Sequence, residues 1–557
     1  MAITRKDTLL TPELIEKYTA AGYWSEETLA DAFRRNADQF PDEVAYVDDH
    51  SEVTWGEVWQ ISGEVASGLA RRGVGRGDVL AVQLPNRIEF VFVLAAVVRL
   101  GAVFCQFPPD YRAREIEFIL RFSEAHTIVV PDRFRGFDYT EMIDGIRDRL
   151  PELVNTVAVT TGESPTALDK DTWVSLDQLR RDLDPADPAP DRPADANDVM
   201  RIAFTSGTTG EPKAVMHTAN TTLYMTRRES EERGIDGDAT LLVFLPVGLN
   251  AGFGTIVQVA NAGARGVLME KFSPTALLDL VERHQVTSFL TAPTALLAIL
   301  RDESLGSRNL SSLRFVQTGG SSTPVEVLRE ANEQLGCPVI DLYGMLESGV
   351  TSCTDPDEPY GESVGTVGRP YEFMQVRVLD SDDANAPTGI EGEIVKNGPT
   401  ICVGYYRNPD KNRESWTTDG WFRSGDRGHL DANGRLTISG RSKDMIIHGG
   451  ANIWPRELEE ILVRHPDVAD AAVIGIHDDY FGENTCACVI PRPGAEPTLE
   501  DLIAFMKDEV AKYKLPQHLE LFDTFPLGPT GKVLKRDLTD EVETRRKAAA
   551  TSEGTAR

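Results

Sequence analysis

Short apolar runs alternate with helical patterns of apolar residues from about residue 78 onward. Residues 79–84 form an apolar run, 89–100 have helical periodicity and 102–105 are apolar again. Alternation of this kind is typical of βαβ units around a parallel sheet. It resumes after a polar connection at 182–198 that is rich in Asp, Pro and Ala. There it predicts strands at 201–205, 241–245, 266–269, 287–290 and 313–317.

The pattern changes twice toward the C-terminus. Beyond residue 360, short strands between Gly, Asp and Asn turns are expected at 375–379, 392–396 and 435–439. After Asp444, a smaller α+β pattern predicts helices at 455–464 and 499–513, with strands at 471–476 and 486–490. Residues 541–557 are expected to form a frayed polar tail.

These patterns predict an α/β protein of two unequal domains. A chain of 557 residues is too long for one compact core. The expected large N-terminal domain, residues 1–442, contains β/α subdomains and a β-rich subdomain. A small α+β C-terminal domain, residues 443–557, follows it.

Charge and hydropathy exclude several classes of protein. A formal net charge of -31 argues against nucleic-acid binding, which needs a basic face. The longest apolar run, 90–98, is well short of the roughly 20 residues of a membrane span. Charged residues interrupt the N-terminus before any signal peptide could form, so a cytoplasmic location is expected. Cys486 and Cys488 lack further ligands and fit a buried strand better than a metal site.

The strongest local motif is residues 205–213, Thr-Ser-Gly-Thr-Thr-Gly-Glu-Pro-Lys, directly after a predicted strand. Two glycines let the backbone approach phosphates, while four hydroxyls, the amide N–H groups and Lys213 can bind them. The motif is not a Walker loop, because Glu211 and Pro212 separate Gly210 from Lys213.

This string resembles the phosphate-binding loop of the adenylate-forming superfamily, which includes acyl-CoA synthetases, peptide-synthetase adenylation domains and beetle luciferases. Five further segments resemble family motifs in the same order, at 341–347, 421–426, 440–444, 448–457 and 529–532. Within the superfamily, residues 107–115 and 131–138 look most like those of cyclohexanecarboxylate–CoA ligase-like members. The resemblance covers nearly the whole chain.

The resemblance implies an acid:CoA ligase that uses ATP, Mg²⁺ and coenzyme A. Lys532 and Lys213 would be catalytic cations, and Glu347 would hold Mg²⁺. Asp426 would accept hydrogen bonds from the ribose, with Arg441 beside ribose or phosphate. The remaining implied nucleotide- or CoA-binding residues are Thr205, Ser206, Gly207, Thr208, Thr209, Gly210, Gly319, Gly320, Ser321, Asp341, Tyr343, Gly344, Gly449 and Gly450. Lys443 would be the hinge between the two domains, so the resemblance also implies that the small C-terminal domain is mobile.

The acyl pocket is expected from the same resemblance. Its implied residues are Leu249, Asn250, Phe253, Gly254, Met345 and Leu346. None is acidic, so nothing there would pair with an amino-acid ammonium group, which argues against a peptide-synthetase adenylation domain. A bulky alicyclic, aryl or fatty acid is the expected substrate.

Two residues depart from the family pattern. Leu346 stands where relatives usually carry threonine, and Ala214 where they usually carry glycine. A lost hydroxyl donor near phosphate leaves an alternative open, in which the chain only converts a preformed acyl-adenylate to a thioester. A stand-alone enzyme that loads a carrier protein is a further alternative. The partner would then be a separate adenylating enzyme or a carrier protein.

Overall fold

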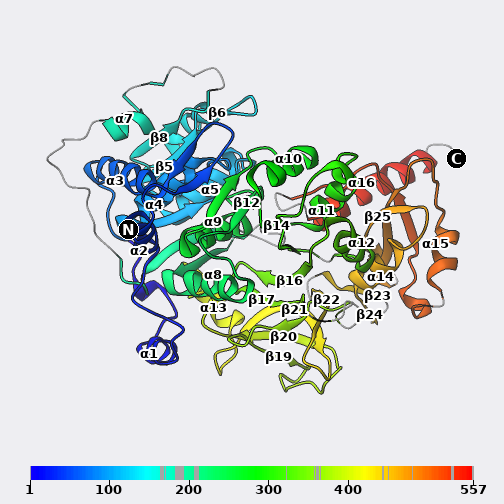
Figure 1. Cartoon of the computed structure of the whole chain (residues 1–557). Helices are drawn as coiled ribbons and strands as arrows, with labels where there is room; N and C mark the ends of the chain where they lie inside the picture. Colours follow the sequence, from blue (N-terminus) through cyan, green and yellow to red (C-terminus); the bar gives the residue numbers. More distant parts are fainter. Residues whose placement is uncertain are drawn as a thin grey trace.

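The structure, a computed structural model, contains four principal sheets with helices around them (Figure 1). It describes residues 2–162, 168–169, 171–181, 194–205, 213–321, 323–356, 358, 363, 365–441, 444–448, 451–478, 481–507, 509–528 and 532–554. The predicted mixed α/β class, with a large N-terminal and a smaller C-terminal part, is confirmed. In Figure 1 the two parts lie side by side, with the C-terminal part in orange and red.

A seven-stranded sheet has the order β11-β10-β4-β3-β5-β8-β9. All of its pairings are parallel except that of β10 with β11. Its strands are β3 (Val79–Val82), β4 (Val103–Gln106), β5 (Thr127–Pro131), β8 (Asn155–Val159), β9 (Trp173–Ser175), β10 (Val199–Phe204) and β11 (Ala214–Thr218).

A nine-stranded sheet has the order β18-β17-β16-β15-β14-β12-β13-β1-β2. Its core from β16 to β1 is parallel, while β2, β17 and β18 add antiparallel edges. Its strands are β1 (Val44–Val47), β2 (Glu52–Thr54), β12 (Thr240–Val243), β13 (Arg265–Leu268), β14 (Ser288–Thr291), β15 (Phe315–Gly319), β16 (Val339–Met345), β17 (Gly349–Cys353) and β18 (Arg369–Pro370).

The helices of the large part follow the predicted alternation with strands. Helix α10 has a capped start, because Ser273 Oγ accepts from the Ala276 N–H and Pro274 occupies the first helical position. The helices are α1 (Pro12–Ala20), α2 (Leu29–Gln39), α3 (Trp55–Arg71), α4 (Ile88–Arg99), α5 (Ala113–Ser123), α6 (Tyr139–Asp144), α7 (Leu176–Arg181), α8 (Ala219–Arg233), α9 (Asn250–Ala262), α10 (Pro274–His284), α11 (Pro293–Leu300), α12 (Val325–Leu335) and α13 (Pro409–Ser415). A small hairpin pairs β6 (Arg133–Phe134) with β7 (Phe137–Asp138).

The apolar run at 90–98 lies in α4, where these residues are buried in a core that reaches both large sheets. That core includes Leu80 of β3 and Leu241 of β12. A search of the described helices finds none that is long and apolar enough to cross a membrane.

The β-rich part is a four-stranded antiparallel sheet, drawn in yellow-green in Figure 1. Its strands are β19 (Gln375–Leu379), β20 (Gly392–Asn397), β21 (Phe422–Leu430) and β22 (Leu436–Arg441). The C-terminal part has a five-stranded sheet with three helices. Its elements are β23 (Ile446–His448), β24 (Ala451–Ile453), α14 (Pro455–Leu462), β25 (Val468–Asp478), β26 (Gly482–Pro491), α15 (Leu499–Met506), β27 (His518–Leu521) and α16 (Lys535–Gly554).

Two expectations for the C-terminal part are wrong. The helix expected over 499–513 ends at Met506, where the Lys507 N–H donates to the Ile503 carbonyl in the last turn, and a separate 3-10 segment follows at Lys512–Lys514. The tail expected from residue 541 is helical to Gly554. Leu538 and Val542 are fully buried in the cluster that contains Cys486 and Cys488, which anchors the helix.

Candidate functional site

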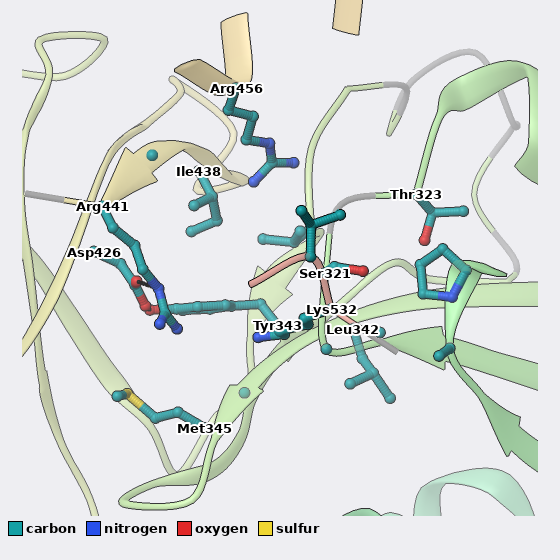
Figure 2. A pocket seen from close by; sticks show the side chains of 18 of the residues that line it. Ser321, Thr323, Leu342, Tyr343, Met345, Asp426, Ile438, Arg441, Arg456 and Lys532 are labelled. Carbon is teal, nitrogen blue, oxygen red and sulfur yellow. Dashed lines mark hydrogen bonds and ion pairs between the residues drawn. The ribbon is translucent and has the colours of Figure 1, made fainter. Parts of the chain in front are cut away.

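A cavity of about 2770 Å³ extends between the large part and the C-terminal part. Figure 2 shows a pocket with residues from both parts around it. The cavity collects every predicted site residue that the structure describes, namely Thr205, Lys213, Leu249, Asn250, Phe253, Gly254, Gly319, Gly320, Ser321, Asp341, Tyr343, Gly344, Met345, Leu346, Glu347, Asp426, Arg441 and Lys532. The other predicted residues, Ser206, Gly207, Thr208, Thr209, Gly210, Lys443, Gly449 and Gly450, lie outside the described residues.

One wall of the cavity contains a carboxylate, Asp426, that is held by a hydrogen bond from Tyr343 and an ion pair with Arg441 (Figure 2). The Tyr343 hydroxyl donates to Asp426 Oδ2 over 2.6 Å, and Arg441 Nε lies 2.8 Å from Asp426 Oδ1. Strands β21 and β22 place Asp426 and Arg441 directly opposite each other. Asp426 raises the pKa of Arg441, and burial together with Asp426 raises that of Tyr343. The carboxylate of Asp426 is therefore fixed in position and is only 2% exposed.

A glycine turn follows β15 beside the Tyr343 wall. A Cβ on Gly319 would lie 2.5 Å from Leu342 Cδ1 and 2.8 Å from its carbonyl oxygen. Gly320 has a φ of +87°, which side-chain-bearing residues rarely adopt. The turn thus presents backbone groups to the cavity without intervening side chains. Such groups can form hydrogen bonds with the edge of an adenine ring.

Glu347 lies in the tight turn between β16 and β17 and is 5% exposed. Its Oε1 accepts from the Tyr405 hydroxyl over 2.9 Å. The Lys213 ammonium lies 5.4 Å from the centroid of the same Tyr405 ring. Burial lowers the pKa of Lys213, while the nearby Glu347 opposes that shift. The arrangement places a carboxylate and an ammonium around one end of the cavity.

The two departures from the family pattern lie beside this end. The Leu346 side chain packs against an apolar cluster of Val215, Cys402, Tyr405 and Phe422. The backbone carbonyl oxygen of Leu346 lies 2.7 Å from His217 Nε2. The Thr205 hydroxyl accepts from the Lys213 N–H over 3.3 Å, which leaves its own proton available for another acceptor.

Asp341 is a buried carboxyl at the same wall, 5% exposed. Burial raises its pKa to about 7, against the opposing effects of Arg456 and of the Thr323 hydroxyl. Thr323 Oγ1 donates to Asp341 Oδ1 over 3.4 Å. Because the folded protein binds this proton more tightly than the unfolded chain, stability is lost as pH rises from about 4 to about 7.

Asp341→Asn should therefore stabilise the protein, and more so at pH 7.5 than at pH 5. The amide is isosteric and carries no charge that burial would penalise. We expect its advantage in the free energy of unfolding to be about 2 kcal/mol larger at the higher pH. Urea unfolding of both proteins at the two pH values measures the difference. An advantage independent of pH would contradict the assignment of this burial cost to Asp341.

The sequence analysis missed a buried lysine. Lys396 of β20 is fully buried, and its Nζ lies 4.0 Å from the Tyr343 ring centroid and 3.3 Å from Ser348 Oγ. Burial lowers its pKa to about 8, while Asp426 and Glu347 oppose that shift. The ammonium thus lies behind the cavity wall, within the field of both carboxylates. Its signal in the sequence is a basic residue within the strand Gly392–Asn397, which also contains Glu393.

Lys532 comes from the C-terminal part and lines the same cavity as Tyr343 and Asp426 (Figure 2). The Gly528 N–H donates to the Lys532 carbonyl over 2.8 Å, and a β-bridge joins Leu527 to Val533. These pairings place Lys532 in a cavity whose other predicted site residues lie between Thr205 and Arg441 in the sequence.

The predicted acyl residues line a part of this cavity, hereafter the acyl chamber, to which α8, α9 and the end of β16 contribute side chains. Phe253 is fully buried, whereas a Cβ on Gly254 would meet no atom within 4 Å. The chamber is more polar than the six predicted residues indicated. Further polar residues in its wall are Arg201, His217, Thr222, Glu229, Gln258 and Gln317.

Comparison with known proteins gives the same assignment over nearly the full length. The AMP-binding enzyme family matches residues 33–406, and the AMP-binding enzyme C-terminal domain matches residues 457–532. The chain is 32% identical to a 2,3-dihydroxybenzoate-AMP ligase of Bacillus subtilis over 95% of this chain and 96% of the relative. It is 31% identical to a medium-chain fatty-acid–CoA ligase of Escherichia coli over 93% and 91%, respectively. An ATP-bound MatB structure from Rhodopseudomonas palustris superposes with a TM-score of 0.81 at 27% identity, covering 92% of this chain and 98% of that one.

The chain therefore belongs to the AMP-binding enzyme family of the adenylate-forming superfamily. It is an adenylate-forming acid ligase, and the prediction of an acid–thiol ligase is confirmed at the level of enzyme class. Adenylate-forming enzymes use ATP.

Proposed function

We propose that the chain is an AMP-forming acyl-CoA ligase with two half-reactions. In the first, a carboxylate oxygen of the acid attacks the α-phosphorus of ATP, and pyrophosphate leaves to give the acyl-adenylate. In the second, the thiol of coenzyme A attacks the acyl carbon, AMP leaves, and one proton is released. The observation that carries the proposal is the convergence of Lys213, Glu347, Asp426 and Lys532 on one cavity.

The first half-reaction brings two anions together, so its main requirement is positive charge at the reacting atoms. Lys532 would bridge carboxylate and phosphate oxygens with its three donors. Lys213 would bind phosphate oxygens together with the hydroxyls of the 205–210 loop. Glu347 fits Mg²⁺, since its Oε2 has no hydrogen-bond or ion-pair partner among the described residues and Mg²⁺ prefers one or two carboxylates plus phosphate oxygens. The ion would neutralise phosphate charge when bound.

The nucleotide would be held by the Tyr343 wall. Asp426 would accept hydrogen bonds from the ribose hydroxyls, and the Arg441 ion pair would keep that carboxylate oriented. The adenine would lie against Tyr343, along the Gly319–Gly320 backbone. Asp341 would face the adenine from within β16.

The two half-reactions would use two positions of the C-terminal part. We assign residues 1–442 and 443–557 as the two domains, with Lys443 as the hinge whose backbone rotation exchanges the positions. In the second position the Gly449–Gly450 segment would line the tunnel for the thiol-bearing arm. Lys532 lines the cavity, and this supports the proposal that the arrangement described here would serve adenylation.

The acid would be a bulky alicyclic, aryl or fatty acid. The relatives' names, an aryl-acid AMP ligase and a fatty-acid–CoA ligase, support both an aromatic and an aliphatic range. Incubation with ATP, Mg²⁺, coenzyme A and a panel of carboxylic acids tests the proposal, with pyrophosphate and thioester measured separately. Pyrophosphate with thioester supports it. Acyl-adenylate without thioester would instead indicate transfer to a carrier protein, and ATP binding without turnover would contradict catalysis.

Leu346→Thr should change acid-dependent pyrophosphate exchange by less than about threefold. The Thr205 hydroxyl retains a proton to donate, and the leucine is accommodated by the Val215 cluster. Removal of a needed donor would instead cost about 10²- to 10³-fold in rate. Exchange that appears only in the variant would identify the wild-type chain as a thioesterification-only enzyme.

A further inference from the structure

An arginine with an unusual environment stands in the wall of the acyl chamber. Arg201 of β10 is 3% exposed and pairs in register with His217 of β11. Its Cζ lies 4.3 Å from the Phe253 ring centroid, and its Nη2 donates to Asn250 Oδ1 over 2.7 Å. Its Nε is buried and finds no hydrogen-bond partner in the part of the chain that the structure describes.

The charge of Arg201 has no protein counter-ion among the described residues. Burial alone lowers its pKa to about 9, so it remains a cation at neutral pH. His217 beside it is neutral, because burial and Arg201 lower its pKa to about 3. A buried cation without a carboxylate partner is strongly unfavourable, so an anion from outside the chain would relieve it.

The other buried charge in the chamber wall is already balanced. Glu229 accepts from Gln317 Nε2 and lies in the field of Arg233, while burial raises its pKa. Its carboxylate therefore does not compensate Arg201. The Glu229 carboxylate of the chamber wall therefore has partners, whereas the Arg201 guanidinium has no anionic partner among the described residues.

Two further buried donors face the same chamber. Thr222 Oγ1 on α8 and Gln258 Nε2 on α9 are 9% and 7% exposed as residues, and neither atom has a partner within the described chain. Asn250, Gly254 and Gln258 follow one face of α9 at four-residue spacing. The open space at Gly254 thus lies between Arg201, at the Asn250 end, and Gln258. Since buried polar groups are nearly always bonded, these donors indicate a ligand rich in acceptors.

We infer that the acid activated here carries a second anionic group, a carboxylate remote from the one that reacts with ATP, and that Arg201 binds it. This rests on the proposed function and narrows its substrate class to dicarboxylic acids. A guanidinium matches a carboxylate bidentately, and Phe253 beneath it keeps water away. Arg201 is then a specificity-determining residue, distinct from the cations at the reacting carboxylate.

Matched acids test the inference. Hexanoate is compared with adipate, and benzoate with phthalate, isophthalate and terephthalate, using acid-dependent pyrophosphate exchange. The three hydroxybenzoates test a neutral hydroxyl in place of the anion. We expect kcat/KM for at least one dicarboxylate to exceed that of its monoacid by about 30-fold or more. Higher values for the monoacids, or for the hydroxybenzoates, would overturn the inference.

The variant Arg201→Met tests whether the guanidinium causes the preference for a dicarboxylate over its monoacid. It should lower kcat/KM for the preferred dicarboxylate by about 30-fold or more and leave the monoacid unchanged or improved. Arg99→Met is the matched control, because Arg99 is equally buried, at 5% exposure, but does not line the cavity. An equal loss for both acids in Arg201→Met would place Arg201 at the reacting carboxylate and contradict the inference.

A binding measurement separates this inference from the proposed function. The rise in melting temperature caused by each acid alone needs no chemistry and is measured on wild type and variant. If the dicarboxylate raises the melting temperature of the wild type but not that of Arg201→Met, the result supports the Arg201 site, even when no acid gives pyrophosphate exchange. Absence of exchange with every acid would contradict the adenylation reaction itself. Should Arg201→Met not fold, the wild-type comparison of the paired acids decides. Equal stabilisation by mono- and dicarboxylates would overturn the inference.

Discussion

Lys532→Ala is expected to lower acid-dependent pyrophosphate release by about 10²- to 10³-fold and to leave conversion of a supplied acyl-adenylate to thioester almost unchanged. The ammonium would act on the carboxylate and the α-phosphate, which meet only in the first half-reaction. Once the adenylate exists, the C-terminal part would move and take the lysine away. Pyrophosphate exchange and thioester formation from synthetic acyl-adenylate, measured on one preparation, separate the two steps.

Lys535→Ala is the matched control for this experiment. Lys535 also lines the cavity, but its Nζ forms an ion pair with Glu459 at 2.6 Å. Its removal should leave pyrophosphate release within a few-fold of wild type. Equal loss of both half-reactions in Lys532→Ala would contradict the alternation of the C-terminal part between two positions.

Asp426→Asn is expected to weaken both half-reactions, in contrast to Lys532→Ala. The amide has one acceptor oxygen in place of two, and Arg441 loses the carboxylate that it pairs with at 2.8 Å. Loss of one partner from a buried, hydrogen-bonded charge pair corresponds to about 30-fold or more in affinity. We expect the KM for ATP to rise by that factor, and the KM for supplied acyl-adenylate to rise comparably.

Asp431→Asn gives the comparison for Asp426. Asp431 lies in the turn between β21 and β22 and accepts the Asn433 and Arg435 N–H groups, but it does not line the cavity. Its substitution should leave both KM values unchanged. A defect of Asp426→Asn confined to ATP would show that the residue acts on the triphosphate and not on the ribose.

Local sequence patterns predicted the parallel strands well, because buried strands are short apolar runs between helices with apolar periodicity. Strands β12 to β15 lie within two residues of their expected bounds. The family motifs also identified residues that the fold brings together from Thr205 to Lys532. Those residues were recognised by resemblance to known sequences, since their separation in the chain gives no local sign of proximity.

Arg201 and Lys396 show where such patterns fail. Arg201 is the one charged residue of β10, and Lys396 shares β20 with Glu393. Neither pattern distinguishes an edge position, an ion pair or a cavity wall. The answer depends on contacts with distant segments, since Arg201 meets Asn250 and Phe253, and Lys396 meets Tyr343. The helical tail was missed for the same reason, because Val542 is stabilised by packing against β25 and not by the polar residues around it.

The most direct test of the central claim uses an acid labelled with ¹⁸O in both carboxyl oxygens. The acid that best supports pyrophosphate exchange is incubated with the enzyme, ATP, Mg²⁺ and coenzyme A. The masses of AMP and of the thioester are then measured by mass spectrometry. An acyl-adenylate requires that one labelled oxygen leave with the nucleotide, so AMP should gain one ¹⁸O and the thioester should retain one. Unlabelled AMP, or ADP with labelled phosphate, would contradict an acyl-adenylate intermediate.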